Sequence, residues 1–298
     1  MTPAGGVPPD PVPRTWLYVP GDRPDRIGKA LASGADRVVL DLEDAVAPAG
    51  KQDARRTVLN TLAAGHTAYV RINAPATPDG ADDLALLASA PGTLAGVRVP
   101  KAEDPDELRR VAEALGVPVL PIVESALGVE NALALATAHP LVAGISLGEA
   151  DLAADLRVRG GDALAWPRSR VVVAARAAGL PSPPQSVWTA VRDLDGLRAD
   201  TLAGQRAGFF GRSVIHPAQI PVVHEACVPD PADVAWARDL MSQLTERGSA
   251  AGSSAAWIDS SGRFVDKAVV ERAAWLLAAA ETGATAHPNR DDIKKGHP

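Results

Sequence analysis

Cysteine is nearly absent from this sequence, and aromatic residues and long apolar runs are scarce. The single cysteine, Cys227, cannot form a disulfide within the chain, which suits a reducing cytoplasm. No apolar run reaches the roughly 18 residues that a membrane-spanning helix needs, so no membrane partner is expected. Basic residues are not in excess, because the formal net charge is −6, and this disfavours a nucleic-acid partner.

The beginning of the chain also lacks an apolar core of the kind found in signal peptides. Residues 1–13 are rich in proline and glycine, so we predict a disordered leader there. Hydrophobic residues, in contrast, make up 46% of the 298 residues. This content suffices for one α/β barrel of about 250 residues, and two smaller domains would also fit the length.

Short apolar segments alternate with Ala- and Leu-rich segments of helical spacing. Eight such segments are candidate strands, at residues 15–20, 37–44, 68–73, 96–101, 117–124, 142–147, 180–187 and 211–216. Eight strands alternating with helices predict an α/β fold, a parallel (β/α)8 TIM barrel over residues 14–228. The seventh candidate contains three prolines that cannot donate to a ladder. An open doubly wound sheet is the structural alternative, but no GxGxxG motif follows the first strand.

The chain changes character after His216. An amphipathic helix is expected over residues 229–247, and a linker of small residues follows at 248–254. Two short extended segments and a last helix over 268–282 complete the pattern. We predict that residues 229–285 form a C-terminal helical lid on the barrel and that the polar tail at 286–298 is frayed.

Acidic residues stand at the ends of three apolar strands, namely Asp41, Glu43, Asp44, Glu124, Glu149 and Asp151. The carboxyl ends of the strands form the active face of a parallel barrel, so these acids should converge there with Arg71, Lys101 and His216. Several carboxylates without a cluster of His or Cys favour Mg²⁺ or Mn²⁺ over Zn²⁺. The planar fork of Arg71 suits a substrate carboxylate or an enolate oxygen.

Each of these side chains also has a purely structural interpretation. The acids after the second strand can cap the next helix or pair with Arg55 and Arg56. Asp151 can cap the helix that follows it, and Arg71 can serve only as an ion-pair partner of the acids. We interpret His216, which precedes a proline, as a turn residue.

Six ordered motifs resemble the citrate lyase beta-subunit-like branch of the CoA-ester lyases, which includes malyl-CoA and citramalyl-CoA lyases: RTWLYVPGDRP, VVLDLEDAV, VRIN, LPIVESALG, LGEADLAADL and VIHPAQI. The resemblance covers nearly the whole chain from Arg14 onward. It implies a TIM barrel, usually a homotrimer or hexamer, that binds Mg²⁺ and a CoA thioester.

The resemblance also implies roles for the acids in the barrel. By position, Glu124 and Asp151 match metal ligands, while Glu43 and Asp44 match catalytic acids that hold metal-bound water. Arg71 matches the catalytic arginine beside the 2-oxo acid. The part of the chain that cradles the carboxylate of that substrate corresponds to the backbone of Glu149, Ala150 and Asp151.

Further residues follow from the same resemblance. The GRFVDKAVV segment resembles a lid motif whose aspartate acts as acid/base in a neighbouring subunit, and this role falls on Asp266, with Asp259 as a second candidate. Basic residues near the first strand, namely Arg14, Arg26 and Lys29, are predicted to bind the CoA phosphates. A solvated basic helix face is the alternative for them.

The sequence departs from the family pattern at two places, and the first of them concerns substrate preference. Residues 185–190 read QSVWTA where relatives commonly have Asp-Gly-Val-Tyr-Thr-Asp, so two acids and a tyrosine are missing. Arg212 replaces a lysine, and its planar fork does not copy the contacts of an ammonium.

Together these implications predict a Mg²⁺-dependent lyase that reversibly cleaves a 3-hydroxyacyl-CoA into an acyl-CoA and a 2-oxo acid. Arg71 would hold the thioester enolate, and Asp266 would exchange the proton at its α-carbon. Hydrolysis downstream would instead give a thioesterase or synthase. A metal-dependent aldolase of free 2-oxo acids and a non-catalytic subunit of a lyase complex are the remaining alternatives.

Overall fold

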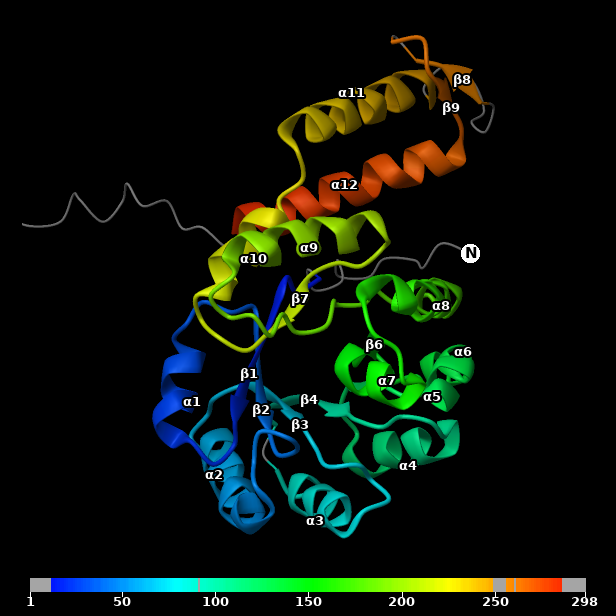
Figure 1. Ribbon diagram of the computed structural model, residues 1–298. Helices are drawn as coiled ribbons and strands as arrows, with labels where there is room; N and C mark the ends of the chain where they lie inside the picture. Colours follow the sequence, from blue (N-terminus) through cyan, green and yellow to red (C-terminus); the bar gives the residue numbers. More distant parts are fainter. Residues whose placement is uncertain (1–11, 91, 249–255, 260, 286–298) are drawn as a thin grey trace, which may run out of the picture. The chain divides into compact units, whose positions relative to one another are not determined.

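The computed structural model describes residues 12–90, 92–248, 256–259 and 261–285 (Figure 1). The predicted leader up to residue 11, the linker from residue 249 and the tail at 286–298 lie outside the described residues. The chain divides into two compact units, one spanning Pro13–Val223 and the other containing the chain from His224 onward.

The first unit is built on a parallel sheet with the strand order β6-β5-β4-β3-β2-β1-β7. Its strands are β1 (Thr15–Pro20), β2 (Arg37–Asp41), β3 (Ala68–Arg71), β4 (Leu94–Val99), β5 (Val119–Val123), β6 (Ser146–Leu147) and β7 (Arg212–Val214). Each of them falls on a candidate strand of the sequence. Because β1 to β6 are neighbours in chain order and all pairs are parallel, each connection must cross back outside the sheet.

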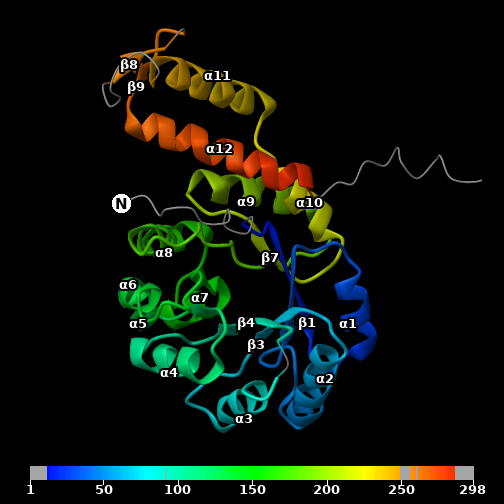
Figure 2. The ribbon, with the colours of Figure 1, turned by 180° about the vertical axis from the view of Figure 1, so that it is seen from behind.

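Helices make these return connections, and Figures 1 and 2 show them around the strands from opposite sides. Proline lies in the first turn of several helices, and Thr77, Asp104 and Asp193 cap three of them. The helices are α1 (Pro24–Leu31), α2 (Lys51–Ala63), α3 (Pro78–Leu87), α4 (Pro105–Leu115), α5 (Ala126–Glu130), α6 (Ala132–Ala136), α7 (Glu149–Leu156), α8 (Ala165–Ala177), α9 (Leu194–Arg206) and α10 (Gln219–Ala226), with 3₁₀ turns at Pro48–Gly50 and Gly161–Leu164.

The sheet is curled, so that its two edge strands approach one another. Arg98 on β4 donates hydrogen bonds to Ser146 of β6 at 2.6 Å and to Ser213 of β7 at 3.4 Å. These strands form the opposite edges of the sheet, yet one side chain reaches both. The predicted α/β fold is therefore confirmed as a curled parallel sheet.

The seventh candidate strand, at residues 180–187, is wrong as a full strand. It contributes a single parallel bridge, from Gln185 to Arg212 of β7. On its other side Ser186 Oγ donates to the Leu147 carbonyl of β6 at 2.5 Å. Prolines just before Gln185 lack the N–H groups that a longer ladder would need.

The concave side of the sheet changes from apolar to polar toward the carboxyl ends of the strands. A buried apolar cluster inside the curl consists of Trp16, Val39 and Leu120. Arg98 packs against this cluster and is only 1% exposed. Its guanidinium carbon lies 5.2 Å from the centre of the Trp16 ring and 5.4 Å from the centre of the Tyr18 ring. A buried guanidinium here differs from the branched apolar side chains usual inside TIM barrels. The Tyr18 ring that it contacts is shared with Arg71, whose guanidinium carbon lies 5.2 Å from the ring centre.

The second unit contains α11 (Pro231–Gly248), an antiparallel pair of short strands, β8 (Trp257–Ile258) and β9 (Phe264–Val265), and α12 (Lys267–Thr285). These elements agree with the predicted helix, extended segments and last helix. Within this unit the two helices and β9 share a buried core of Ala237, Leu240, Val265, Ala273 and Leu276. No helix among the described residues is long and apolar enough to cross a membrane.

Candidate active site

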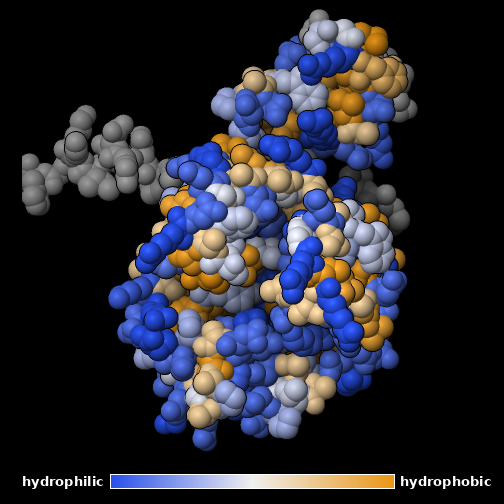
Figure 3. Space-filling model, in the orientation of Figure 1, coloured by the Kyte–Doolittle hydropathy of each residue, from blue (hydrophilic) through white to orange (hydrophobic). Residues whose placement is uncertain are grey.

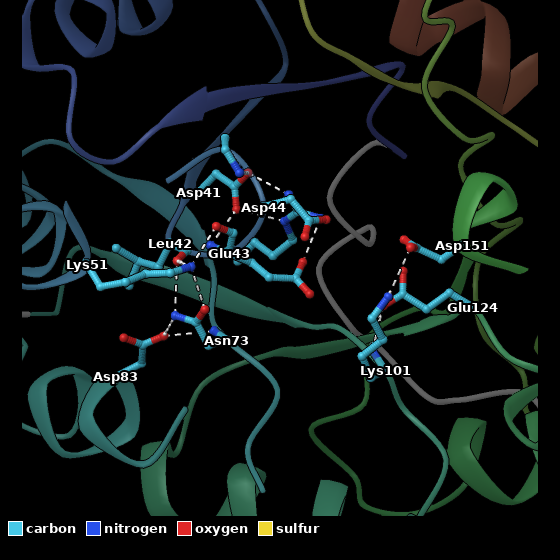
Figure 4. A network of polar contacts seen from close by, with 12 residues as sticks. Asp41, Leu42, Glu43, Asp44, Lys51, Asn73, Asp83, Lys101, Glu124 and Asp151 are labelled. Carbon is cyan, nitrogen blue, oxygen red and sulfur yellow. Dashed lines mark hydrogen bonds and ion pairs between the residues drawn. The ribbon is translucent and has the colours of Figure 1, made fainter. Parts of the chain in front are cut away.

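The predicted acids of the strand ends lie together with Arg71 and Lys101 at the carboxyl ends of the strands, in two groups, most of whose members Figure 4 labels. One group follows β2 and β3 and contains Asp41, Glu43, Asp44 and Arg71. The other group, Lys101, Glu124 and Asp151, follows β4, β5 and β6. Because carboxyl ends of parallel strands meet at one edge, residues far apart in sequence lie together there.

Arg71 is the centre of the first group. Its Nε and Nη2 donate to the two carboxylate oxygens of Asp41 at 2.7 and 2.5 Å. Its Nη1 lies 2.8 Å from Glu43 Oε2 and 3.3 Å from Asp44 Oδ2. The structural alternative for Arg71, an ion-pair partner of the acids, is therefore observed, and Nη1 is the part of the fork that contacts Glu43 and Asp44.

Arg55 and Arg56, the other suggested partners of these acids, bind elsewhere. Arg55 pairs with Asp79 and Asp83, each at 2.6 Å, and Arg56 pairs with Asp53 at 2.6 Å. The acids after β2 therefore depend on Arg71 for compensation.

Glu43 is buried, and burial raises the pKa of its carboxyl to about 8. The charge of Arg71 opposes this increase in the pKa, whereas Asp44 and Glu124 add to it. Although Glu43 Oε2 lies close to Arg71, it accepts no hydrogen bond within the described part of the chain. The carboxyl group can therefore carry a proton near neutral pH, which suits a proton donor or acceptor.

The raised pKa of Glu43 predicts a pH-dependent stability of the metal-free chain. Because the pKa of about 8 in the folded chain exceeds the ordinary glutamate value of 4.5, the protonated carboxyl stabilises the fold fully below pH 4.5, and this contribution is lost as pH rises through 8. We expect urea unfolding with a chelator to show a loss of about 1–3 kcal/mol between roughly pH 6 and 9. Glu43→Gln should remove most of this slope. An equal change of stability with pH in the wild type and in Glu43→Gln would contradict the raised pKa of Glu43.

A buried network that the sequence analysis missed holds the loop that carries Glu43. Lys51 Nζ donates to the carbonyls of Leu42 and Glu43 and to Asn73 Oδ1, each at 2.7 Å. Asn73 in turn donates to the fully buried Asp83 at 2.7 Å (Figure 4). A lysine at the first position of a helix is electrostatically unfavourable, and this was the available signal that Lys51 serves another purpose.

The two predicted metal ligands meet at one cation in the second group. Lys101 Nζ lies 3.2 Å from Glu124 Oε1 and 3.2 Å from Asp151 Oδ1. Glu124 is only 4% exposed, and burial raises its pKa, while the Lys101 amide opposes the increase. Because both oxygens lie 3.2 Å from the same nitrogen, Glu124 Oε1 and Asp151 Oδ1 are separated by at most twice that distance. A position that holds one cation between two carboxylates exists in this fold.

The donors at this position fit magnesium. No group of three or more His, Cys, Asp or Glu side chains is placed to hold a metal among the described residues. Mg²⁺ commonly takes one or two carboxylates and completes its octahedron with water and substrate. Glu124 and Asp151 supply such a pair of hard oxygen donors.

Gly148 makes room for Glu124. A Cβ atom at this position would lie 2.4 Å from Glu124 Oε2 and 2.8 Å from Glu124 Cβ. We therefore expect Gly148→Ala to displace the carboxylate and to weaken Mg²⁺ binding about tenfold or more in calorimetry, although no ligand is removed. Gly144→Ala is the control, because its Cβ would have only an ordinary contact of 3.5 Å with Leu120. Equal affinities of the two variants would contradict this placement of Glu124.

Helix α7 begins at the predicted carboxylate cradle. The Glu149 amide donates to Ser186 Oγ at 3.3 Å, and the Glu149 carboxylate accepts from Arg168 at 2.9 and 2.5 Å. The amides of Ala150 and Asp151 belong to the first turn, which has no carbonyl of its own helix within reach. Such amides suit an anionic group. The capping alternative for Asp151 is wrong, because Gly148 occupies the N-cap position.

Comparison with protein families gives a match over residues 14–217 to the model described as HpcH/HpaI aldolase/citrate lyase. The chain belongs to the HpcH/HpaI aldolase/citrate lyase family. A (3S)-malyl-CoA thioesterase of Cereibacter sphaeroides is 34% identical over 276 residues, which cover 90% of this chain and 94% of the relative. A citrate lyase subunit beta-like protein of Mycobacterium tuberculosis is 37% identical over 274 residues, 89% of this chain and 94% of the relative.

Solved structures of HpcH/HpaI family members are also similar. CitE of M. tuberculosis, in complex with magnesium, acetoacetate and coenzyme A, has a TM-score of 0.78 and 34% identity, over 91% of this chain and 99% of that chain. The citrate lyase beta subunit of M. tuberculosis with oxaloacetate and magnesium has a TM-score of 0.66 and 36% identity, over 73% and 97% of the two chains. The chain is thus a citrate lyase beta-subunit-like member of a family of lyases whose solved relatives bind magnesium and coenzyme A.

The basic residues predicted to bind CoA in this HpcH/HpaI family member do not gather in one place. Arg14 stands at the amino end of β1, where it is buried and pairs with Asp36 at 3.2 Å. This end of the strand is opposite to the acids, so the placement disfavours a CoA contact of Arg14. Arg26 and Lys29 are exposed on α1. They remain predictions.

The two candidate lid acids of the second unit have different surroundings. Asp259 Oδ1 accepts from the amides of Ser261 and Arg263, each at 2.9 Å, and therefore closes a turn. Asp266 is exposed, and its carboxylate accepts from the Val269 amide at 3.1 Å, as the cap of α12. Of the two carboxylates, that of Asp266 is the more accessible to a substrate.

Two other predicted positions have structural contacts. His216 Nδ1 accepts from the Ala218 amide at 3.1 Å, as expected of a turn residue. Arg212 is buried and donates to both Gln185 and Asp200. Both hydrogen bonds are donated by the same nitrogen, Nη2, while the buried Nε has no hydrogen-bond partner among the described residues.

Proposed function

We propose that this chain is a Mg²⁺-dependent lyase that cleaves or forms a 3-hydroxyacyl-CoA, such as malyl-CoA or citramalyl-CoA, with an acyl-CoA and a 2-oxo acid as the other reactants. The observation that carries the proposal is the meeting of Glu124 and Asp151 at one cation position, beside the Arg71 group. The ligands of the solved relatives, magnesium with oxaloacetate or with acetoacetate and coenzyme A, support this substrate class.

Residues of the first unit divide the work of binding and charge stabilisation. Magnesium held by Glu124 and Asp151 would act as a Lewis acid toward the substrate oxygens. The Ala150 and Asp151 amides bind the carboxylate of the 2-oxo acid. Arg71, held in one orientation by Asp41, directs Nη1 toward the enolate oxygen, and a fixed cation of this kind stabilises developing negative charge. Glu43 and Asp44 position water.

The remaining parts of the proposal concern assembly. We propose that residues 180–187 close the curled sheet into a barrel, that Asp266 is the acid/base in a neighbouring subunit, and that Arg26 and Lys29 bind the CoA phosphates. A homotrimer or hexamer is supported by large apolar side chains exposed on neighbouring helices, Leu127, Leu133, Trp166 and Val173. Apolar patches interrupt the hydrophilic surface in Figure 3.

The experiment is a product analysis. The full chain is incubated with malyl-CoA or citramalyl-CoA, with Mg²⁺ or with a chelator, and the products are separated by chromatography. The proposal predicts Mg²⁺-dependent appearance of acetyl-CoA together with a 2-oxo acid. Inactivity on a broad panel of such thioesters, with magnesium present, would overturn it.

A thioesterase is the second candidate, because the Cereibacter relative carries that name and matches most of the chain. It predicts free CoA as the final product of the same incubation.

An aldolase of free 2-oxo acids would bind pyruvate with Mg²⁺ but no CoA ester. A non-catalytic subunit would show no turnover alone, and its co-purification with an acyl-carrier or transferase partner would identify it.

A further inference from the structure

Lys101 lies between the two acids that the proposed function makes metal ligands. Its Nζ is 3.2 Å from Glu124 Oε1 and 3.2 Å from Asp151 Oδ1 (Figure 4). Its backbone amide donates to the same Glu124 oxygen at 2.7 Å. One residue therefore holds Glu124 by two contacts and Asp151 by a third.

The backbone of Lys101 is also unusual. Its φ of 50° lies in the left-handed region, where residues other than glycine are uncommon. Such a conformation persists where the surroundings over-determine it, and it is often found at functional sites. Here it follows the last residues of β4 and accompanies the double contact of amide and ammonium with Glu124.

A divalent cation and the Lys101 ammonium need the same oxygens. A metal bound by Glu124 and Asp151 would take the carboxylate oxygens that the ammonium now contacts, and two cations a few ångströms apart repel each other strongly. The Lys101 side chain is 42% exposed and has a long flexible stem, so the ammonium can move into solvent. The amide contact with Glu124 involves the backbone and need not change.

We propose that Lys101 is a resident counter-ion of the metal site, which keeps Glu124 and Asp151 together without metal and is displaced when Mg²⁺ binds. The inference rests on the proposed function, because it requires these two acids to be the ligands. It has a counter-intuitive consequence: removing a residue that contacts both ligands should improve metal binding. The cost should appear in the metal-free chain, where the two acids would then repel each other without compensation.

Calorimetric titration of the metal-free full chain with Mg²⁺, and separately with Mn²⁺, tests the proposal. We expect Lys101→Met to bind each ion about five- to twentyfold more tightly than the wild type. Arg110→Met, which removes a positive charge from an exposed pair with Asp104 on α4, is the matched control and should change the affinity less than twofold. Unchanged or weaker binding by Lys101→Met would overturn the proposal.

Thermal unfolding supplies a second measurement that does not depend on turnover. In the presence of a chelator, Lys101→Met should melt several degrees below the wild type, and saturating Mg²⁺ should remove most of the difference. Equal melting temperatures with chelator would contradict the counter-ion. Failure of the metal site itself is distinguishable, since neither the wild type nor Lys101→Met would then bind Mg²⁺, whereas a failed counter-ion leaves normal Mg²⁺ binding in both.

Discussion

Glu124→Gln should abolish Mg²⁺ binding in calorimetry and lower the Mg²⁺-dependent cleavage of malyl-CoA by about a thousandfold or more. The amide has nearly the shape of the carboxylate and retains an oxygen for the Lys101 amide, whose hydrogen bond to Glu124 is 2.7 Å long. It lacks the negative charge that a divalent ion requires. Because burial already raises the pKa of Glu124, loss of the charge should not reduce the stability of the metal-free chain.

The control for Glu124→Gln is a second acidic residue whose charge is not needed for metal binding. Glu130 is exposed at the end of α5, so Glu130→Gln changes the net charge equally and should retain both binding and turnover. Circular dichroism and thermal unfolding with a chelator show whether both variants fold. Folded Glu124→Gln that still binds Mg²⁺ within tenfold of the wild type would eliminate Glu124 as a ligand.

Asp266→Asn should lower turnover by about a hundred- to ten-thousandfold while leaving Mg²⁺ affinity unchanged, because the residue is proposed to move a proton and not to bind the metal. Asn retains an oxygen that can accept from the Val269 amide, which Asp266 now does at 3.1 Å, so the cap of α12 should survive. Stability should therefore change little.

Mixing the two inactive variants tests whether Asp266 acts in a neighbouring subunit. Asp266→Asn chains keep an intact metal site, and Glu124→Gln chains keep an intact lid acid. In a mixed oligomer some sites therefore combine the metal site of the first variant with Asp266 of the second. Part of the activity should return after the subunits are dissociated and reassembled together, and each variant reassembled alone should stay inactive. Absence of recovery in mixed oligomers, verified by tags on the two chains, would place the acid over its own barrel.

The positions of the strands and of the acids at their ends could be predicted because both are local properties. A run such as Val38, Val39 and Leu40 is compatible with a buried strand wherever it pairs, and all three residues are indeed buried in β2. An acid after such a run must lie at the carboxyl edge. The convergence of Glu124 and Asp151 follows from this geometry alone.

The partners of the charged side chains could not be predicted, because they depend on which strands are neighbours and where each side chain points. The sequence leaves open whether Arg71 pairs with the acids or binds a substrate, and it does not indicate that Arg14 faces the amino end of its strand. Arg98 is the clearest case, since a fully buried guanidinium is held by two serine hydroxyls from opposite edges of the sheet. Such a site exists only after the sheet has curled.

The single bridge at Gln185 has a consequence for how members of this family can diverge. Within this segment Gln185 is buried and its side chain bonds to Thr201 and Arg212, whereas the residues after it add no strand pairing to the sheet, so a change there should cost less folding stability. The same segment touches the first turn of α7 through Ser186, next to the amides proposed to receive the substrate. Substitutions at residues 186–190 can therefore adapt this side of the proposed site to another acyl or oxo-acid group, while the acids of the other strands stay the same.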